Sequence, residues 1–402
     1  MNSNFDVIVI GSGPAGASAA IELAKKNINV LIIEKQSLPR YKTCGGGVIF
    51  KANGYLDFKM NQISELNCFT AEINDFKSNL KFITKRENPL VQMVMRKDFD
   101  FYLIKKAEEY GAKIIDSLEV EFVNYNSGSI EVRTGKQSFT AKFIIDASGA
   151  ISNFRNTAES GNKSKKIPAL EYEIFVDADI YEKYNKTVRF DFGVVPNGYA
   201  WVFPKRGHLS IGVLSMKRNG VNLNGSFLKY MKILGIEKNY KAERHGYVIP
   251  IYNETTELYK NRTLLVGDAA NLADPITGEG ISSAILSGKL AAFSLVEADM
   301  NEKLIGNIYN RKLNEKIIKE LKAAKFLANF IYGNEKVRAS IFRLYGRRLS
   351  ELITDVITAD KKYTEIVKDP LNYFKLFVRW SLKNNKLLNY QNSCLNLYRS
   401  SK

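Results

Sequence analysis

The hydrophobic positions of the first 35 residues predict a strand, a helix and a second strand. Residues 5–10 form a mostly apolar, β-branched run, and the glycine-rich turn 11–16 follows it directly. An alanine-rich helical stretch then leads to a second apolar run, residues 30–33, which ends at Glu34. Strands of a parallel sheet are buried on both faces and appear as continuous apolar runs separated by helices. This stretch therefore predicts a βαβ unit in an α/β domain.

The next part of the chain continues with strands and one clear helix. Residues 89–95 predict a strand, and residues 96–110 predict a helix with Asp98 as its N-cap. Residues 119–145 alternate between apolar and polar positions, as in a β-meander, and close on the buried run 143–146. We expect this last run to be a further strand of the first sheet.

From residue 160 to residue 255 the pattern changes to an alternation with period two. Successive side chains of a strand point to opposite faces, so Tyr199, Trp201 and Phe203 are expected on one face. The region predicts a separate, largely antiparallel sheet with an aromatic face. Ordinary core packing explains such a face about as well as an apolar substrate cavity does.

The C-terminal part of the chain is predicted to be mainly helical. Residues 263–266 form one more buried strand, and Gly278-Glu279-Gly280 opens a helix that is expected to reach about Ala298. Beyond residue 300 lysines lie away from an apolar helical stripe, and a late helix is expected over residues 371–382. The stripe consists of Leu313, Ile317, Leu321, Ala324, Ala328 and Ile331.

These segments predict an α/β (α+β) protein with three regions. Residues 1–70, 92–155 and 256–300 are assigned to a Rossmann-like, dinucleotide-binding domain. Residues 71–91 and 156–255 are assigned to an interleaved antiparallel-sheet domain for the substrate, and residues 301–402 to a basic helical region. A chain of 402 residues is long enough to bury a sizeable core in two or three domains.

The net charge of +17 is concentrated near the C-terminal end. Residues 301–402 hold 21 Lys and Arg against 9 Asp and Glu, which accounts for +12 of the total. Anionic lipid, a phosphorylated substrate or nucleic acid would suit such a region, although a solvated basic surface explains it equally well. We expect an anionic membrane surface rather than nucleic acid as the partner.

The cysteine pattern and the apolar runs predict a cytoplasmic protein that has peripheral access to the inner face of a membrane. Cys44, Cys68 and Cys394 form no paired framework and no metal-ligand spacing, so neither disulfides nor a metal is expected. A charged segment before the first apolar run is lacking, and no eighteen apolar residues are consecutive. We therefore expect neither a signal peptide nor a membrane-spanning helix.

The turn Gly11-x-Gly13-x-x-Gly16 carries the first chemical signal. Gly11 permits the tight turn, Gly13 lets backbone N–H groups approach a pyrophosphate, and Gly16 lets the helix pack against the strand. The helix N-terminus then faces the anion. Glu34 is placed to accept hydrogen bonds from ribose hydroxyls, and its charge disfavours a 2′-phosphate. The combination predicts a bound dinucleotide.

Further motifs resemble those of the FAD-dependent oxidoreductases with the para-hydroxybenzoate hydroxylase fold, over residues 5 to about 298. They are Arg96-Lys97-x-Phe99-Asp100, Asp146-Ala147-Ser148-Gly149 and the segment 267–281. Two more segments are similar to signatures of the geranylgeranyl reductase family, which saturates prenyl chains of chlorophyll, quinones or archaeal lipids. These are Pro39-x-x-x-x-Cys44-Gly45-Gly46-Gly47 and Tyr199-x-Trp201-x-Phe203-Pro204.

The resemblance implies that one FAD is bound along these motifs. It places the adenosine ribose on Glu34, the pyrophosphate on the glycine turn and Arg96, the ribityl chain and pyrophosphate on Asp268, and the flavin pyrimidine edge beside residues 278–281. The implied cofactor contacts are Gly11, Gly13, Pro14, Ala15, Gly16, Glu34, Lys35, Cys44, Gly45, Gly46, Arg96, Gly149, Gly267, Asp268, Pro275, Gly278, Gly280 and Ile281. The residues implied to line the substrate cavity are Gly47, Tyr199, Trp201 and Phe203.

The implied reaction is the reduction of carbon–carbon double bonds in an isoprenoid chain on a lipid, a quinone or a prenyl diphosphate. Reduced flavin supplies hydride, but an unpolarised alkene also needs a proton at its other carbon. Cys44, Tyr41 and Tyr199 are the candidate donors. We prefer Cys44, whose neighbouring glycines expose backbone donors, although a small packing residue is the competing interpretation.

Three questions stay open at this stage. The electrons come from transiently bound NAD(P)H or from a ferredoxin-like donor, because the sequence contains one dinucleotide-binding motif. An aromatic hydroxylase fits the same fold, and its need for oxygen would distinguish it. A non-catalytic flavoprotein associated with lipid or nucleic acid is the third hypothesis, supported by the basic region alone.

We interpret His208 and His245 as structural residues.

Overall fold

The βαβ unit predicted from the opening residues forms the centre of an eight-stranded sheet. β1 (Asn4–Ile10) leads through the glycine turn into α1 (Pro14–Ala24), and β2 (Val30–Ile33) lies parallel to β1. The computed structural model describes residues 3–135, 137–151, 165–236, 240–254 and 257–369. The helix expected over residues 371–382, and Cys394, lie outside the described residues.

The order of strands in the first sheet is β17-β18-β11-β1-β2-β8, with β9 and β10 attached to β11. β11 pairs in parallel with β1 on one side and with β18 on the other, so strands far apart in sequence belong to one sheet. The predicted meander 119–145 corresponds to β9, β10 and β11. The bounds are β8 (Lys113–Ile115), β9 (Val120–Tyr125), β10 (Ile130–Thr134), β11 (Ser138–Asp146), β17 (Tyr259–Lys260) and β18 (Thr263–Leu265).

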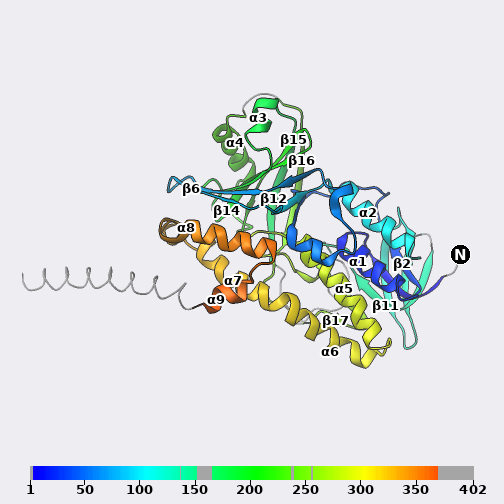
Figure 1. Ribbon diagram of the computed structural model, residues 1–402. Coiled ribbons are helices and arrows are strands. Elements are labelled where there is room, and N and C mark those ends of the chain that lie inside the picture. The colour runs from blue at the N-terminus through cyan, green and yellow to red at the C-terminus, as the bar shows by residue number, and fades with distance from the viewer. Residues whose placement is uncertain (1–2, 136, 152–164, 237–239, 255–256, 370–402) are drawn as a thin grey trace, which may run out of the picture.

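Alternate residues of β1 and β2 bury two different faces of this sheet. Val7 and Val9 pack with α1, α2 (Arg96–Glu109) and α5 (Ile281–Glu297), whereas Ile8 and Ile10 pack against β9 and β10. α5 lies directly on α1, and both helices start at the same edge of the sheet (Figure 1). This packing brings the two glycine-containing turns, near residues 13 and 280, to one place.

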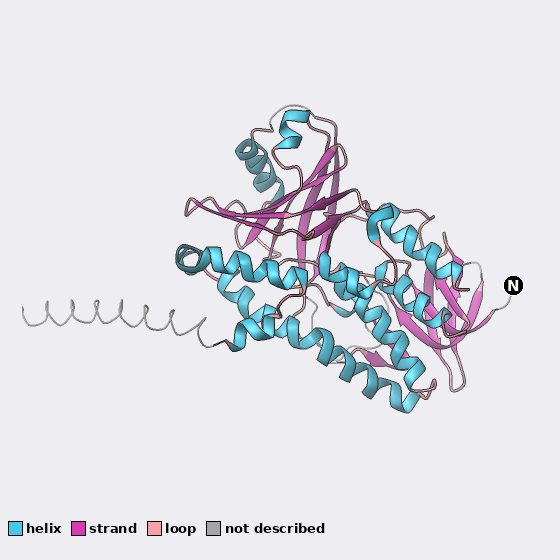
Figure 2. Ribbon diagram, in the orientation of Figure 1, coloured by secondary structure: helices cyan, strands magenta, loops and turns pink. Residues whose placement is uncertain are grey.

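A second sheet has seven strands in the order β16-β12-β15-β14-β13-β5-β6. All its neighbours are antiparallel except β5 and β13. α4 (Leu223–Leu234) covers one face and α8 (Glu335–Thr358) lies on the other (Figure 2). The strands are β5 (Thr70–Asp75), β6 (Leu80–Lys85), β12 (Lys166–Ile174), β13 (Thr187–Phe192), β14 (Gly198–Lys205), β15 (His208–Ser215) and β16 (Ala242–Pro250).

Shorter elements connect the two sheets. A three-stranded sheet, β3-β7-β4, carries the chain from the Gly45–Gly47 loop toward α2. The strand predicted over residues 89–95 is shorter, as β7. The bounds are β3 (Gly47–Ile49), β4 (Leu66–Cys68), β7 (Val91–Met93), the 3₁₀ turns Phe50–Tyr55, Met60–Gln62 and Gly267–Ala270, and α3 (Ala178–Glu182).

The C-terminal helices wrap around both sheets. α6 (Glu302–Leu313) continues through a π-helical turn (Asn314–Ile318) into α7 (Lys319–Tyr332), and α9 (Tyr363–Lys368) follows α8. The predicted apolar stripe from Leu313 to Ile331 is buried, which confirms the sequence pattern. Among the helices that the structure describes, none has an apolar stretch of the length that crossing a membrane requires.

Two details differ from the sequence prediction. α2 begins at Arg96 with Met95 as its N-cap, so Asp98 lies inside the first turn and does not cap the helix. A carboxylate in that turn still interacts favourably with the helix dipole. α4 was not predicted, although Asn222 caps it by accepting a hydrogen bond from Gly225 N and Gly235 ends it with a φ of +70°.

Candidate active site

A cavity of about 640 Å³ collects most of the predicted site residues from both sheets. Gly16, Gly267 and Pro275 are not among the residues that line it, and neither is Tyr41. The predicted residues that do line it are Gly11, Gly13, Pro14, Ala15, Glu34, Lys35, Cys44, Gly45, Gly46, Gly47, Arg96, Gly149, Tyr199, Trp201, Phe203, Asp268, Gly278, Gly280 and Ile281. Segments far apart in sequence therefore share one cavity.

The first glycine turn leaves space for a ligand at one position only. A Cβ at Gly11, where φ is +102°, would lie 2.4 Å from Ala147 O, and one at Gly16 would lie 2.0 Å from Gly11 O. These two glycines are needed for packing. A Cβ at Gly13 would meet nothing nearer than the Arg40 guanidinium at 3.7 Å, and no side chain caps α1 there. The helix N-terminus is therefore open to an anion in the cavity.

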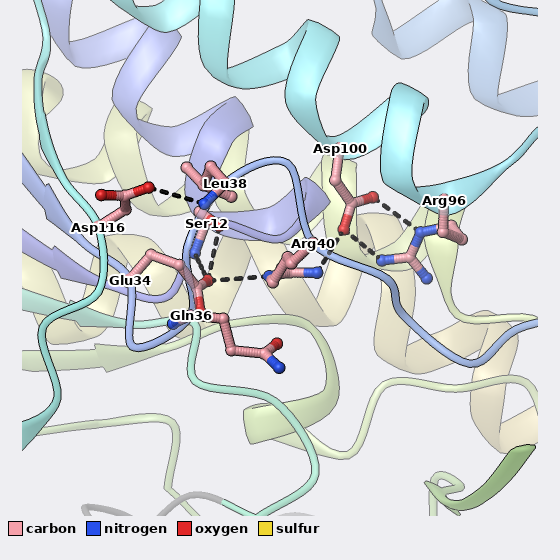
Figure 3. Close-up of polar contacts among 8 residues, drawn as sticks. All are labelled: Ser12, Glu34, Gln36, Leu38, Arg40, Arg96, Asp100 and Asp116. Atoms are coloured by element: carbon pink, nitrogen blue, oxygen red, sulfur yellow. Dashed lines mark hydrogen bonds and ion pairs between the residues drawn. The ribbon is translucent and has the colours of Figure 1, made fainter.

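Glu34 is held at the end of β2 by a set of hydrogen bonds (Figure 3). Ser12 donates to Glu34 Oε2 from its backbone N at 3.0 Å and from its hydroxyl at 2.6 Å, and Arg40 Nε lies 3.1 Å from the same oxygen. Gln36 N donates to Oε1 at 3.1 Å. Burial opposes ionisation, but Arg40 and Ser12 outweigh it and hold the pKa of Glu34 below its usual value. Oε1 keeps accepting capacity for a ribose hydroxyl.

Arg40 links Glu34 to the start of α2. Arg40 Nη1 lies 3.2 Å from Asp100 Oδ2, and Arg96 binds Asp100 with both Nε (2.7 Å) and Nη2 (2.8 Å) (Figure 3). The three side chains are almost completely buried. Asp100 thus fixes two guanidinium groups beside the cavity, and cations in this position suit a pyrophosphate.

Another part of the cavity wall lies at the start of α5. Gly280 is the N-cap of α5, and Asp268 lines the wall next to it. Tyr247 donates a hydrogen bond of 3.4 Å to Asp268 Oδ2, and Lys42 Nζ lies 3.2 Å from the centre of the Tyr247 ring. Burial and then repulsion from Arg96 lower the pKa of Lys42 to about 8. This part of the cavity therefore offers hydrogen-bond donors, acceptors and a cation to the hydroxyls and the anionic ring edge of a bound cofactor.

The Gly45–Gly47 loop lies against the aromatic face of β14. A Cβ at Gly45 would lie 2.9 Å from the Phe203 ring, and one at Gly46, where φ is +72°, would lie 2.2 Å from Val94 O. Trp201 Nε1 is buried at the cavity wall without a hydrogen-bond partner among the described residues. An unpaired buried donor costs free energy until an acceptor reaches it. This donor, the open Gly13 turn and the Glu34 network fit FAD.

Comparisons with known proteins agree with this geometry. The FAD binding domain family matches residues 4–198. The chloroplastic geranylgeranyl diphosphate reductase of Arabidopsis thaliana is 31% identical, with 78% of this chain and 71% of that protein aligned. The chain belongs to the geranylgeranyl reductase family. This reductase is an FAD-dependent oxidoreductase of the class that acts on CH–CH groups.

Other relatives align with most of the reductase, and solved structures share the fold over most of its length. Digeranylgeranylglycerophospholipid reductase 2 of Methanothermobacter thermautotrophicus is 29% identical over 87% of this chain and 94% of that protein. A geranylgeranyl bacteriochlorophyll reductase-like protein of Thermoplasma acidophilum has a TM-score of 0.75 at 24% identity and covers 84% and 90% of the two chains. Halogenase PltM has the same fold at 18% identity, with a TM-score of 0.68 and coverage of 89% and 83%.

The three candidate proton donors occupy different environments in the reductase. Cys44 is half-buried at the cavity wall, and its Sγ accepts a hydrogen bond of 3.4 Å from Gly46 N. Tyr199 donates to Thr277 O, and Tyr41 donates to Glu171 Oε1 at 3.4 Å. Burial raises the pKa of both phenols, and for Tyr41 Glu171 adds to the effect. Both tyrosines therefore hold their protons firmly.

An acidic pair on β12 was not predicted from the sequence. Glu171 lines the cavity and is 1% exposed, and Glu173 lies two residues further along on the same face. Lys205 Nζ forms an ion pair with Glu173, and His208 Nε2 lies 3.2 Å from Glu173 Oε2. His245, which we also interpreted as structural, stacks on Tyr41 with ring centres 4.1 Å apart. The signal available in the sequence was two acidic residues, spaced two apart, within the region predicted to form the antiparallel sheet.

Proposed function

We propose that this reductase saturates carbon–carbon double bonds of an isoprenoid chain carried by a lipid, a quinone or a prenyl diphosphate. The observation that carries the proposal is the continuity of the site: the cofactor motifs, the Gly45–Gly47 loop and the aromatic residues of β14 line one cavity. A mostly apolar wall with a few convergent polar groups suits an apolar substrate. The printed names of relatives, which include geranylgeranyl and digeranylgeranylglycerophospholipid reductases, support the same substrate class.

FAD would be held by residues along the whole cavity. Glu34 would accept from the ribose, the Gly13 turn and Arg96 would hold the pyrophosphate, and Asp268 with the N-terminus of α5 would hold the ribityl and pyrimidine end. When bound and reduced, FAD supplies the hydride that saturation of an alkene requires. The packing of Gly45 on Phe203 and of Gly46 on Val94 O keeps this loop close to the aromatic wall.

An apolar path leads away from the aromatic wall. Phe190, Tyr199, Thr277 and Ile357 line both the main cavity and a second, smaller apolar cavity of about 40 Å³. The second cavity reaches α8, where Phe342, Leu349 and Ile353 line it. A flexible isoprenoid chain longer than the main cavity would extend in this direction. Its burial would exclude water from the site and contribute about 25 cal/mol per Å² of apolar surface.

Anaerobic turnover tests the proposed function. The purified protein loaded with FAD and reduced by dithionite would be incubated with geranylgeranyl diphosphate or a geranylgeranylated lipid, and products would be identified by mass spectrometry. A gain of two hydrogens per double bond without oxygen supports the proposal. Turnover that stops without oxygen would instead support the aromatic hydroxylase, and a protein that binds FAD without turnover would support the non-catalytic hypothesis.

The electron donor belongs to the same proposal. Either NAD(P)H binds transiently or a ferredoxin-like protein delivers the electrons. Anaerobic addition of each donor to the oxidised holoprotein, followed by loss of the flavin absorbance, separates the two.

We further propose that α7 and α8 rest on an anionic membrane surface from the cytoplasmic side, where a lipid-borne substrate would be supplied. Phe326 and Phe330 are 44% and 41% exposed on α7, and Leu344 is 44% exposed on α8. Exposed Lys322, Lys336, Arg343, Arg347 and Arg348 lie on the same two helices. Exposed aromatic residues together with basic ones are typical of surfaces that bind anionic lipid.

A further inference from the structure

The acidic pair on β12 belongs to a group of titratable residues that meet on one face of the second sheet. Strand register places Glu171 opposite His245 on β16 and Gly212 on β15, and Gly212 lies opposite Trp201 on β14. A Cβ at Gly212 would lie 2.1 Å from the Trp201 ring, so this glycine lets the indole lie over β15 beside Glu171. Glu171 therefore lies in the same row as the aromatic wall of the cavity.

Each element that packs against Glu171 contributes charged or titratable residues around it. Tyr41 and Cys44 approach from the loop before β3, and Glu173 comes from β12 itself. The neighbouring strands contribute Lys205 from β14, His208 from β15, and Glu243, His245 and Tyr247 from β16. Within this group Lys205 is a fully buried cation, with 1% exposure.

The balance of charge requires a proton on this pair at neutral pH. Lys205 and His208 both contact Glu173, so Glu173 is the carboxyl that is stabilised as an anion. Glu171 has the Tyr41 hydroxyl as a donor, and no salt bridge joins it to a cation among the residues that the structure describes. A second buried carboxylate beside Glu173 would be an uncompensated charge, which is costly in a low-dielectric environment. Glu171 is therefore the member of the pair that keeps its proton.

The titration behaviour agrees with this assignment. Burial, with a contribution from the neighbouring Glu173, raises the pKa of Glu171 to about 7 against the lowering effect of Lys205. Burial acts on Glu173 as well, but His208 and Lys205 outweigh it and hold the pKa of Glu173 below its usual value. An acid with a pKa near the working pH is suited to proton transfer.

We propose that Glu171 is the proton donor of the reduction and that Tyr41 positions its carboxyl at the cavity wall. This inference rests on the proposed function. In the step, the O–H bond of Glu171 breaks and a C–H bond forms at one alkene carbon, while the other carbon receives hydride from the reduced flavin. The alkene gains two electrons and two hydrogens, the flavin is oxidised, and Glu171 is left as a carboxylate.

The same residues provide a route for returning the proton. Glu173 links Glu171 to His208, and the His208 ring stacks on Phe175, which is 41% exposed, with ring centres 5.0 Å apart. The His208 imidazole can accept a proton at one ring nitrogen while it releases one from the other, so it can pass protons to the pair. The carboxylate formed at Glu171 is reprotonated through this chain before the next double bond is reduced.

Infrared spectroscopy of the oxidised holoprotein tests the protonation state independently of turnover. The parent protein is expected to show a protonated-carboxyl band that disappears as the pH rises through about 7. The band should be missing in Glu171→Gln and unchanged in Glu121→Gln, which alters an exposed glutamate on β9. A titrating band that persists in Glu171→Gln would overturn the assignment.

Single-turnover reduction of an isoprenoid substrate tests the role in catalysis. With equal FAD content and equal flavin reduction, Glu171→Gln is expected to lose roughly 10² to 10⁴-fold in the rate of product formation. Glu171→Asp, which keeps an acid, should recover part of this loss. A parent rate in Glu171→Gln together with a large loss in Cys44→Ser would overturn the proposal in favour of Cys44. If the parent holoprotein reduces no isoprenoid, the donor role fails with the proposed function, and the infrared band still decides whether Glu171 stores a proton.

Discussion

Arg338 on α8 lies 3.3 Å from Asp75 at the end of β5, and both side chains are at most 2% exposed. This pair is a buried ionic contact between a C-terminal helix and the second sheet. Removing one partner of such a pair leaves an uncompensated charge in the interior. The attachment of α8, which lines the smaller apolar cavity, therefore depends on it.

We expect Arg338→Leu to lower the free energy of unfolding by about 3–5 kcal/mol, because Asp75 is left buried and unpaired. Urea denaturation followed by circular dichroism measures the change. The control is Arg347→Leu on the same helix, whose side chain is 91% exposed and which should change stability by less than about 1 kcal/mol. Equal stability of both variants would contradict the importance of the buried pair.

Gly346→Ala should destabilise the contact between α8 and β6. An added Cβ would lie 2.0 Å from Phe82 Cζ, so the ring or the helix has to move. Overpacking of this kind costs about 1–3 kcal/mol and should lower the melting temperature. Gly54→Ala is the matched control, since nothing lies within 4 Å of its added Cβ. Recovery of stability in Gly346→Ala combined with Phe82→Leu would identify the ring as the cause.

Glu34→Gln is expected to weaken FAD binding by about 1.5–3 kcal/mol, because hydrogen bonds to a charged acceptor are stronger than those to a neutral one. The change also removes the partner of Arg40. Fluorescence titration of the apoprotein with FAD measures the affinity, and Glu121→Gln serves as control. Unchanged affinity would mean that the ribose is not bound at Glu34.

The rate of product formation should decline as the pH rises through about 7. The pKa of Glu171 is raised in the folded protein above its ordinary value of 4.5, so the donor form is complete at lower pH and is lost on ionisation. Because the Tyr41 hydrogen bond favours the carboxylate, Tyr41→Phe should raise the pKa of Glu171 further and move the decline to higher pH. A pH profile measured by single turnover decides this, and a shift to lower pH would contradict it.

Binding to vesicles that contain anionic phospholipid should require the aromatic residues of α7. The double variant Phe326→Ser and Phe330→Ser is expected to lose most binding in a co-sedimentation assay, and raised salt should weaken binding of the parent protein. Phe122→Ser is the matched control, since Phe122 is 65% exposed on β9 of the first sheet, away from α7. Equal losses in both variants would argue against a specific surface.

Much of the fold was predictable because its signals are local. The roles of Gly11, Gly13 and Gly16 follow from a single turn; in the structure Gly11 and Gly16 are closely packed, whereas Gly13 leaves open space. The aromatic face of β14 follows from alternation along one strand, and Tyr199, Trp201 and Phe203 do line the cavity. In such segments, neighbouring residues alone determine which side chains point inward.

The features that were missed depend on pairing between distant segments. Glu173 meets Lys205 and His208 only after β12, β14 and β15 align in register. Asp75 and Arg338 are 263 residues apart in sequence. One error was local: Asp98 satisfies the composition rule for an N-cap, yet α2 begins two residues before it, at Arg96. A sequence pattern states which residues prefer burial, but not which distant partners they find there.

The proposed FAD site is assembled from two segments that are far apart in sequence. The glycine turn before α1 and the start of α5 face the same cavity, and they are contributed by residues 11–16 and 278–281. β18, which precedes α5, also completes the parallel part of the first sheet beside β11. A nascent polypeptide on the ribosome that has emerged only through β11 contains the glycine turn before α1 but lacks the start of α5, which lines the same cavity. Cofactor capture is therefore a late event in biosynthesis, and truncated translation products would leave the ribosome without a flavin.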